Sequence, residues 1–101
     1  MKKIINGKKY DTQTARYICS YQHSYPGDFS YCYEALYLKK TGEFFLYGEG
    51  GPMTEYSVAV GQNTWSGGEE IRPLTKREAL KFAEKNMSAD DFEEEFGQVQ
   101  E

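Results

Sequence analysis

The sequence predicts an α+β domain, in which a small antiparallel β-sheet built from hairpins as a meander packs against C-terminal α-helices. Three observations lead to this prediction. Short β-prone, aromatic segments separated by turn residues fill the first half of the chain, two capped helical segments lie near its end, and 101 residues suffice for one modest core. We expect one domain over residues 1–101, with strands within 2–50 and 69–74, a long loop at about 52–68, and helices at about 76–86 and 89–96.

The first element is a hairpin in "KIINGKKY", where Asn6-Gly7 separates two β-prone pieces. Asn-Gly is the strongest short-range hairpin signal because both residues accept positive φ. The flanking pieces are short, so the rest of the domain must hold this hairpin in place.

Residues 12–22 permit two interpretations. The β-branched and aromatic residues of "ARYICSY" favour a strand with Ile18 on one side and three side chains on the other, namely Tyr17, Cys19 and Tyr21. A helix opened by Asp11 or Thr12 is the alternative, since apolar residues at 15, 18 and 19 also fit the helical period. We prefer the strand, followed by a loop at the Pro-Gly-Asp turn of "HSYPGDFS".

The central hairpin is "YCYEALYLKKTGEFFLYGEGG". Lys40-Thr41-Gly42 suits a three-residue loop with Gly42 in the left-handed conformation. That loop sets a register that pairs Lys39 with Glu43, Tyr37 with Phe45, and Ala35 with Tyr47.

The same register predicts two apolar faces of the hairpin. One face carries Tyr31, Tyr33, Tyr37, Phe45 and Tyr47, and the other carries Cys32, Leu36, Leu38, Phe44 and Leu46. We expect the Leu/Phe face to form the main core, and the tyrosine face to be partly covered by loops or by a partner.

After Gly51-Pro52, "SVAV" suggests a short strand, but the surrounding Gly, Asn and Ser favour a loop, and we leave 52–68 as one. "EEIRPLT" is a short strand that Pro73 places at a sheet edge or at its own end. Thr75 with Glu78 forms a capping box that opens the first helix. Ser88 with Asp91 opens the second, which Gly97 ends.

The glycines of "GEGG" raise the question of a ligand loop. Both phosphate-binding fingerprints fail, because Met53 stands where a third glycine is needed and no Lys follows. We therefore interpret Gly48, Gly50 and Gly51, like Gly42, as structural turn residues that bend the chain before Pro52. At least one of these three glycines should then have positive φ.

We expect no catalytic site, no cofactor and no metal. Cys19 and His23 stand four residues apart on the predicted strand, about 13 Å along the chain, too far for a nucleophile and its base. One histidine and two widely spaced cysteines match no zinc pattern. Clustered carboxylates near the C-terminus are typical of a solvated helix face.

Three surfaces are candidates for binding. The leading hypothesis is a protein partner on the aromatic sheet face and the 48–67 loop, because nine of the sixteen aromatic residues are tyrosines. Its candidate residues are Tyr31, Tyr33, Tyr37, Phe45, Tyr47 and Trp65. The first alternative is nucleic acid, held by a helix and the hairpin tip through Lys39, Lys40, Arg77, Lys81 and Lys85. The second alternative is an acidic helix that mimics DNA and inhibits a host defence nuclease through Glu93, Glu94 and Glu95.

Charge and hydropathy limit the kind of partner and the cellular location that we expect. Residues 1–50 carry seven Lys/Arg and five Asp/Glu, and residues 51–101 carry five and eleven, so a net charge of −4 divides into +2 and −6. The negative total weighs against nucleic acid. No apolar run approaches the length of a membrane span, and the start lacks a signal-peptide core, so we expect a cytoplasmic protein without a membrane partner.

The chain also resembles a family of small proteins from conjugative transposons, plasmids and prophages of Clostridia and related Firmicutes. The resemblance rests on "INGKKYDTQTA", "YEALYLKKTGEFFLYGEGGPMTEY", "WSGGEEIRPLTKREALKFAE" and "FEEEFG", in that order, and spans nearly the whole chain. The family often has Thr in place of Ala35 and Trp in place of Phe82. The resemblance implies no activity; it implies an accessory protein of a mobile element in the bacterial cytoplasm.

Overall fold

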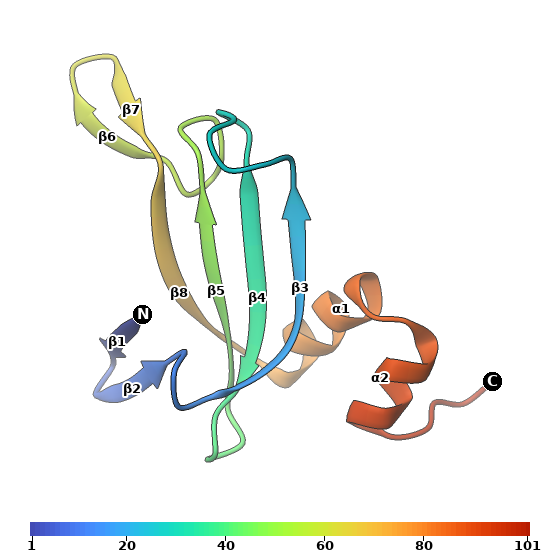
Figure 1. The fold of residues 1–101 in the computed structure, drawn as a ribbon. Helices are drawn as coiled ribbons and strands as arrows, with labels where there is room; N and C mark the ends of the chain where they lie inside the picture. The colour runs from blue at the N-terminus through green and yellow to red at the C-terminus, as the bar shows by residue number, and fades with distance from the viewer.

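Four antiparallel strands form a central sheet in the order β3-β4-β5-β8, with two separate hairpins and two C-terminal helices around it (Figure 1). The computed structural model describes all of residues 1–101. Its elements are β1 Lys2–Ile5, β2 Lys8–Asp11, β3 Arg16–His23, β4 Cys32–Leu38, β5 Phe44–Gly50, β6 Val58–Gly61, β7 Thr64–Ser66, β8 Gly68–Leu74, α1 Lys76–Asn86 and α2 Ala89–Phe96. The predicted α+β class is confirmed.

The β4–β5 hairpin has the predicted register. Tyr37 is paired with Phe45 and Ala35 with Tyr47, and the Lys39 N–H donates to the Glu43 carbonyl over 2.8 Å. Gly42 has φ of 93°, so it takes the left-handed position that the three-residue loop requires. This turn marks one end of the sheet, which we call the turn end; the opposite end, where β3–β4 and β5–β6 connect, is the loop end.

Residues 16–23 form a strand, and the helix alternative is wrong. A β-bulge between Tyr17 and Cys19 nevertheless alters which face each side chain occupies. The Tyr17 ring meets the Tyr37 ring edge-on at 6.0 Å on the tyrosine face, whereas Cys19 is buried on the face that the helices cover. The extra residue shifts the alternation by one, so the prediction that Tyr17 and Cys19 share a side is wrong.

The helices begin where the sequence predicts. At α1 the Glu78 N–H donates to Thr75 Oγ1 over 3.2 Å and the Thr75 N–H donates to Glu78 Oε1 over 2.8 Å, which completes the capping box. Ser88 Oγ accepts from the Asp91 N–H at α2. The small side chains of Ala79 and Ala83 let α1 lie close to the sheet. With three residues of the strands they form the main core, which consists of Cys19, Leu36, Phe44, Ala79 and Ala83.

The N-terminal hairpin covers the turn end of the tyrosine face. Tyr10 on β2 is buried and meets the Phe45 ring edge-on at 5.5 Å, with Ile71 of β8 beside them. Phe45 is 0% exposed as a result. A second, smaller core therefore lies on the opposite side of the sheet from the helices.

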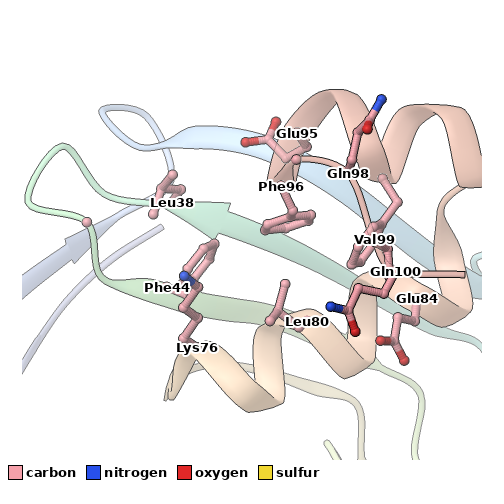
Figure 2. Close-up of a pocket in the computed structure, with 13 residues that line it drawn as sticks. Leu38, Phe44, Lys76, Leu80, Glu84, Glu95, Phe96, Gln98, Val99 and Gln100 are labelled. Atoms are coloured by element: carbon pink, nitrogen blue, oxygen red, sulfur yellow. The ribbon is translucent and has the colours of Figure 1, made fainter.

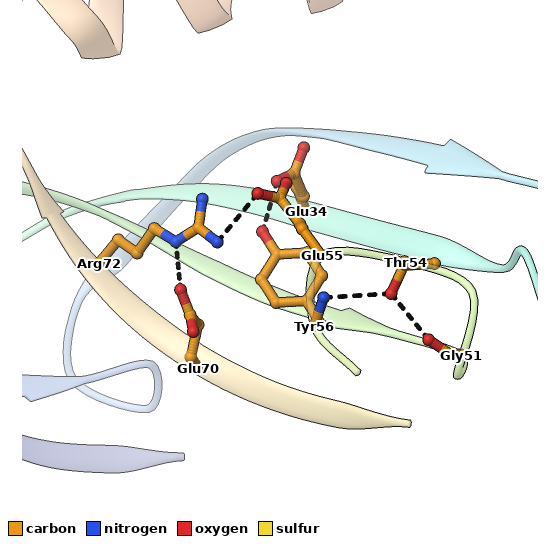
Figure 3. Close-up of polar contacts among 7 residues, drawn as sticks. All are labelled: Glu34, Gly51, Thr54, Glu55, Tyr56, Glu70 and Arg72. Carbon is orange, nitrogen blue, oxygen red and sulfur yellow. Dashed lines mark hydrogen bonds and ion pairs between the residues drawn. The ribbon is translucent and has the colours of Figure 1, made fainter. Parts of the chain in front are cut away.

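The loop end of the helix-covered face is closed by Tyr56, in the connection after β5 (Figure 3). Its ring is 3% exposed, and its hydroxyl donates to a Glu34 carboxylate oxygen. The Arg72 guanidinium lies 5.1 Å from the ring centroid and forms ion pairs with Glu55 and Glu70. The helices, the N-terminal hairpin and Tyr56 thus each cover a part of the sheet, and the loop-end half of the tyrosine face is left open.

Residues 52–68 are not the long loop that we expected. Val58–Gly61 and Thr64–Ser66 pair as an antiparallel hairpin, with Asn63 at φ of 58° in its turn. The Gly, Asn and Ser residues that favoured a loop form this turn and its flanks, so the prediction is wrong for the middle of the segment. The hairpin projects beyond the loop end of the sheet, and every residue from 58 to 67 is exposed (Figure 1).

The turn interpretation is wrong for Gly48 and Gly50, and so is the prediction of a positive φ among the three glycines. Gly51 does begin a turn, because the Thr54 N–H donates to its carbonyl over 3.2 Å. Gly48 and Gly50 lie inside β5, and none of the three has positive φ. A Cβ on Gly48 would overlap the Tyr56 ring, one on Gly50 would overlap Thr54 Oγ1, and one on Gly51 would lie 2.5 Å from the Phe29 carbonyl oxygen. These glycines are therefore required for close packing of the connection against the sheet.

Candidate protein-binding surface

The open half of the tyrosine face contains a shallow groove of about 330 Å3. Met1, Thr12, Tyr33, Tyr37, Tyr47 and Glu69 line it, and we call it the tyrosine groove. The Tyr33 and Tyr47 rings lie 6.5 Å apart, and Tyr37 stacks on buried Phe45 at 5.3 Å. The core thus fixes the floor of the groove, while the upper parts of the tyrosine rings stay accessible.

A second groove of about 560 Å3 adjoins the first at the loop end. Its lining includes Asp28, Phe29, Tyr31, Glu49, Gly51 and Glu69. Glu69 belongs to both grooves, so the two form one continuous surface. No Lys, Arg or His lines either groove.

Hydrogen bonds hold Tyr47 between two carboxylates. Its hydroxyl lies 2.8 Å from Glu69 Oε2 and 3.3 Å from Glu49 Oε1. Burial, followed by the hydrogen bond to Glu69, raises the pKa of Tyr47 well above its ordinary value, so the hydroxyl is a donor at neutral pH.

The structure retains four of the six predicted partner-binding residues in this region. Tyr31, Tyr33, Tyr37 and Tyr47 are half-buried along the two grooves. Phe45 is removed from the set, because Tyr10 and Tyr37 enclose it completely. Trp65 is 59% exposed, but it lies on β7 in the projecting hairpin and not on the tyrosine face.

A further group of exposed large apolar side chains lies at the loop end, and the sequence predicted only its part within residues 48–67. The β3–β4 connection, the β5–β6 connection and the β6–β7 hairpin carry them, namely Tyr25, Phe29, Met53, Val58, Val60 and Trp65. The Met53 N–H donates to the Phe29 carbonyl over 3.0 Å, which joins two of these connections. The signal was available in the sequence, because residues 57–68 include no charged residue.

The predicted nucleic-acid grip does not assemble. Arg77, Lys81 and Lys85 are exposed along α1 and form no ion pair. Lys39, however, pairs with Glu43 at 3.1 Å and lies 4.2 Å from the centroid of the Tyr10 ring, on the face opposite α1. Of the two hairpin-tip lysines, only Lys40 is exposed.

The acidic helix α2 is partly neutralised. Arg16 on β3 donates through both terminal nitrogens to the Glu95 carboxylate, over 2.6 and 2.5 Å. Glu94 is exposed and Glu93 half-buried, so the three predicted carboxylates do not form one free acidic stripe.

The largest cavity, about 710 Å3, lies between the two helices and the turn end of β4 and β5 (Figure 2). Apolar side chains including Leu38, Phe44, Leu80 and Phe96 line it, and the C-terminal residues Gln98 to Gln100 lie along its opening. Two carboxylates, Glu84 and Glu95, also line it, and Glu95 is held by Arg16. We interpret this cavity as a gap in helix–sheet packing.

The thiols do not form a reactive site. Cys19 is buried below α1, and burial raises its pKa to about 11, so it is a neutral thiol at physiological pH. His23 is exposed at the other end of the same strand. No group of three or more His, Cys, Asp or Glu side chains is placed to hold a metal ion.

Comparison of the chain with family models, with curated proteins and with solved structures finds no match. Neither helix has the length and apolar character needed to cross a bilayer.

Proposed function

We propose that this protein is a non-enzymatic binding module that docks another protein on its tyrosine groove. The observation that supports the proposal is the uneven covering of the sheet. The helices, the N-terminal hairpin and Tyr56 cover other parts of the sheet, and the loop-end half of the tyrosine face presents half-buried tyrosines. Tyrosine is enriched in protein interfaces because its ring packs while its hydroxyl stays hydrogen-bonded.

The charge of the surface favours a protein over a nucleic acid. Asp28, Glu49 and Glu69 line the grooves, and no basic side chain joins them. Phosphate backbones are bound by Lys and Arg, and carboxylates in the contact surface repel them. The apolar surface at the loop end adjoins the second groove through Phe29 and extends the area that a protein partner can bury.

The biological setting is also part of the proposal. Resemblance to small proteins of conjugative transposons, plasmids and prophages supports an accessory role for a mobile element. We place that role in the bacterial cytoplasm, with a protein of the element or of its host as the partner.

The test is a pull-down with purified protein from cells that carry the element, comparing wild type with the Tyr33→Ala/Tyr47→Ala variant. Tyr37 is left unchanged because it stacks on Phe45 in the core. We expect the variant to lose the captured protein while its circular dichroism spectrum stays the same.

Tyr21→Ala provides the matched control, because Tyr21 is also exposed but lies on β3 opposite Glu34, outside both grooves. It should capture the partner as well as wild type does. Equal capture by the Tyr33→Ala/Tyr47→Ala variant would overturn the proposal, as would loss of capture by Tyr21→Ala to the same extent.

A further inference from the structure

Two glutamates stand directly opposite one another in the open half of the tyrosine face. Glu49 on β5 and Glu69 on β8 are cross-strand partners on the tyrosine face. Neither forms an ion pair, and the Tyr47 hydroxyl between them has only one proton to donate. Like charges directly opposite on neighbouring strands destabilise a sheet, and no lysine or arginine side chain of the protein compensates this pair.

Elsewhere the same protein combines a tyrosine, a carboxylate and a cation twice. Lys39 lies over the Tyr10 ring and pairs with Glu43. Arg72 lies over the Tyr56 ring and pairs with Glu55 and Glu70. In both places the cation is attracted by the ring face as well as by the carboxylate.

The tyrosine groove repeats this arrangement without a lysine or arginine, and its one cationic group, the Met1 ammonium, donates to Thr12 Oγ1 over 2.8 Å and forms no ion pair with either glutamate. Tyr47 lies between the two carboxylates, and Tyr33 stands beside it. We infer that a lysine or arginine side chain of the docked protein supplies the missing cation, and that it is carried on an extended segment lying along the grooves. The inference rests on the proposed function and specifies the chemistry of its partner.

An extended segment fits because the two grooves adjoin at Glu69, with one over the strands and the other at the loop end. Alternate residues of an extended chain point to the same side, so a basic residue at every second position would face the carboxylates. A nucleic acid would bring phosphates to the same two glutamates and be repelled.

The experiment is a 1H–15N NMR titration of the whole chain with acetyl-Gly-Lys-Gly-Lys-Gly-amide, and with the same peptide carrying Glu for Lys. We expect the lysine peptide alone to shift the amide signals of Tyr33, Tyr47, Glu49 and Glu69. Its affinity should fall on going from about 20 mM to about 300 mM NaCl, because ions screen exposed charges. Equal shifts with both peptides would overturn the inference.

The variant Glu49→Gln/Glu69→Gln should bind the lysine peptide with an affinity at least tenfold lower than that of wild type. Asp90→Asn/Glu94→Gln is the matched control, since it makes the same change in net charge on exposed positions of α2. This control should bind the lysine peptide as well as wild type does. An equal loss of affinity in the control would show that only net charge matters and would refute the proposed site.

The same variants separate the inference from the proposed function. If Tyr33→Ala/Tyr47→Ala loses the protein partner while Glu49→Gln/Glu69→Gln retains it, the cation inference is wrong and the proposed function stands. If both variants retain the partner, both proposals are wrong.

Discussion

The ring of Tyr56 occupies the space that a side chain on Gly48 would fill. Eight residues separate the two positions, and the chain turns back between them so that the ring lies on the sheet over the strand it has just left. Glu34 holds the hydroxyl, and Arg72 covers the ring. The absence of a side chain at position 48 is therefore what allows the loop end of the sheet to close.

Replacing Gly48 with alanine should destabilise the fold by about 2 kcal/mol, because the added methyl must displace a buried ring. Urea unfolding measures the change. Gly61→Ala is the control, since the nearest atom to its added Cβ would be 3.7 Å away, and it should have little effect. In a Tyr56→Ala background the cost of Gly48→Ala should shrink, and an unchanged cost would contradict this account.

Two aromatic residues of the same connection should respond differently to truncation. Tyr56→Ala should cost about 3 kcal/mol or more, as expected for a buried aromatic ring. Trp65→Ala should change stability by no more than about 0.5 kcal/mol, because its side chain is exposed on a hairpin that pairs only with itself. Urea unfolding of both variants checks the contrast, and a large loss for Trp65→Ala would show that the hairpin packs against the domain.

Stability should depend on Glu43 at acidic pH. Hydrogen bonds from Lys8, then from Lys39 and Thr41, lower its pKa from 4.5 to about 2. A depressed carboxyl pKa contributes stability that is complete above about 4.5 and is lost as the pH falls toward 2. NMR titration should find this pKa in wild type and a higher one in Lys8→Ala. Wild type should also lose more stability than Glu43→Gln over that range, and equal losses would count against the ion pairs.

The Cys19 thiol should resist alkylation in the folded protein. Burial, and to a lesser degree Glu95, raises its pKa to about 11, so little thiolate exists at pH 8. In a Cys32→Ser variant, iodoacetamide should label Cys19 slowly until urea unfolds the chain. Labelling of the folded protein as fast as that of the unfolded chain would show that α1 does not protect the thiol.

The capping box predicts a measurable contribution from Thr75. Thr75→Ala removes the acceptor for the Glu78 N–H and should cost about 1 kcal/mol, whereas Thr75→Ser keeps the hydroxyl and most of the stability. Thermal unfolding of both variants measures the difference. Equal losses in the two would mean that the methyl group matters and the hydrogen bond does not.

Local chemistry explains which parts of the fold the sequence predicts. Turn residues with one permitted conformation, such as Gly42, and caps such as Thr75 with Glu78 act within a few residues, so the hairpin register and helix starts follow from the sequence. The bulge at Tyr17 does not follow from the sequence, because it depends on how β3 packs against both β4 and α1.

The candidate site was predictable only in part for the same reason. Alternation along β4 and β5 places the tyrosines on one face, but burial of Phe45 depends on Tyr10, thirty-five residues earlier. The opposition of Glu49 and Glu69 requires β8 to pair with β5, across a connection that the sequence left as a loop. Packing between distant segments determines both the burial of Phe45 and the position of Glu69, and no local sequence pattern predicts such packing.

The projecting β6–β7 hairpin leaves and rejoins the domain at nearly the same point. Gly50 faces Gly68 across β5 and β8, and a Cβ on Gly68 would lie 2.5 Å from the Tyr56 carbonyl oxygen. Packing of the residues up to Tyr56 against Gly68 already fixes the two points where the hairpin leaves and rejoins the domain. Lengthening the hairpin between these points therefore adds only a slowly growing entropic cost. Residues 58–66 therefore form an insertion that can be shortened, extended or exchanged for a foreign peptide without reorganising the sheet that carries it.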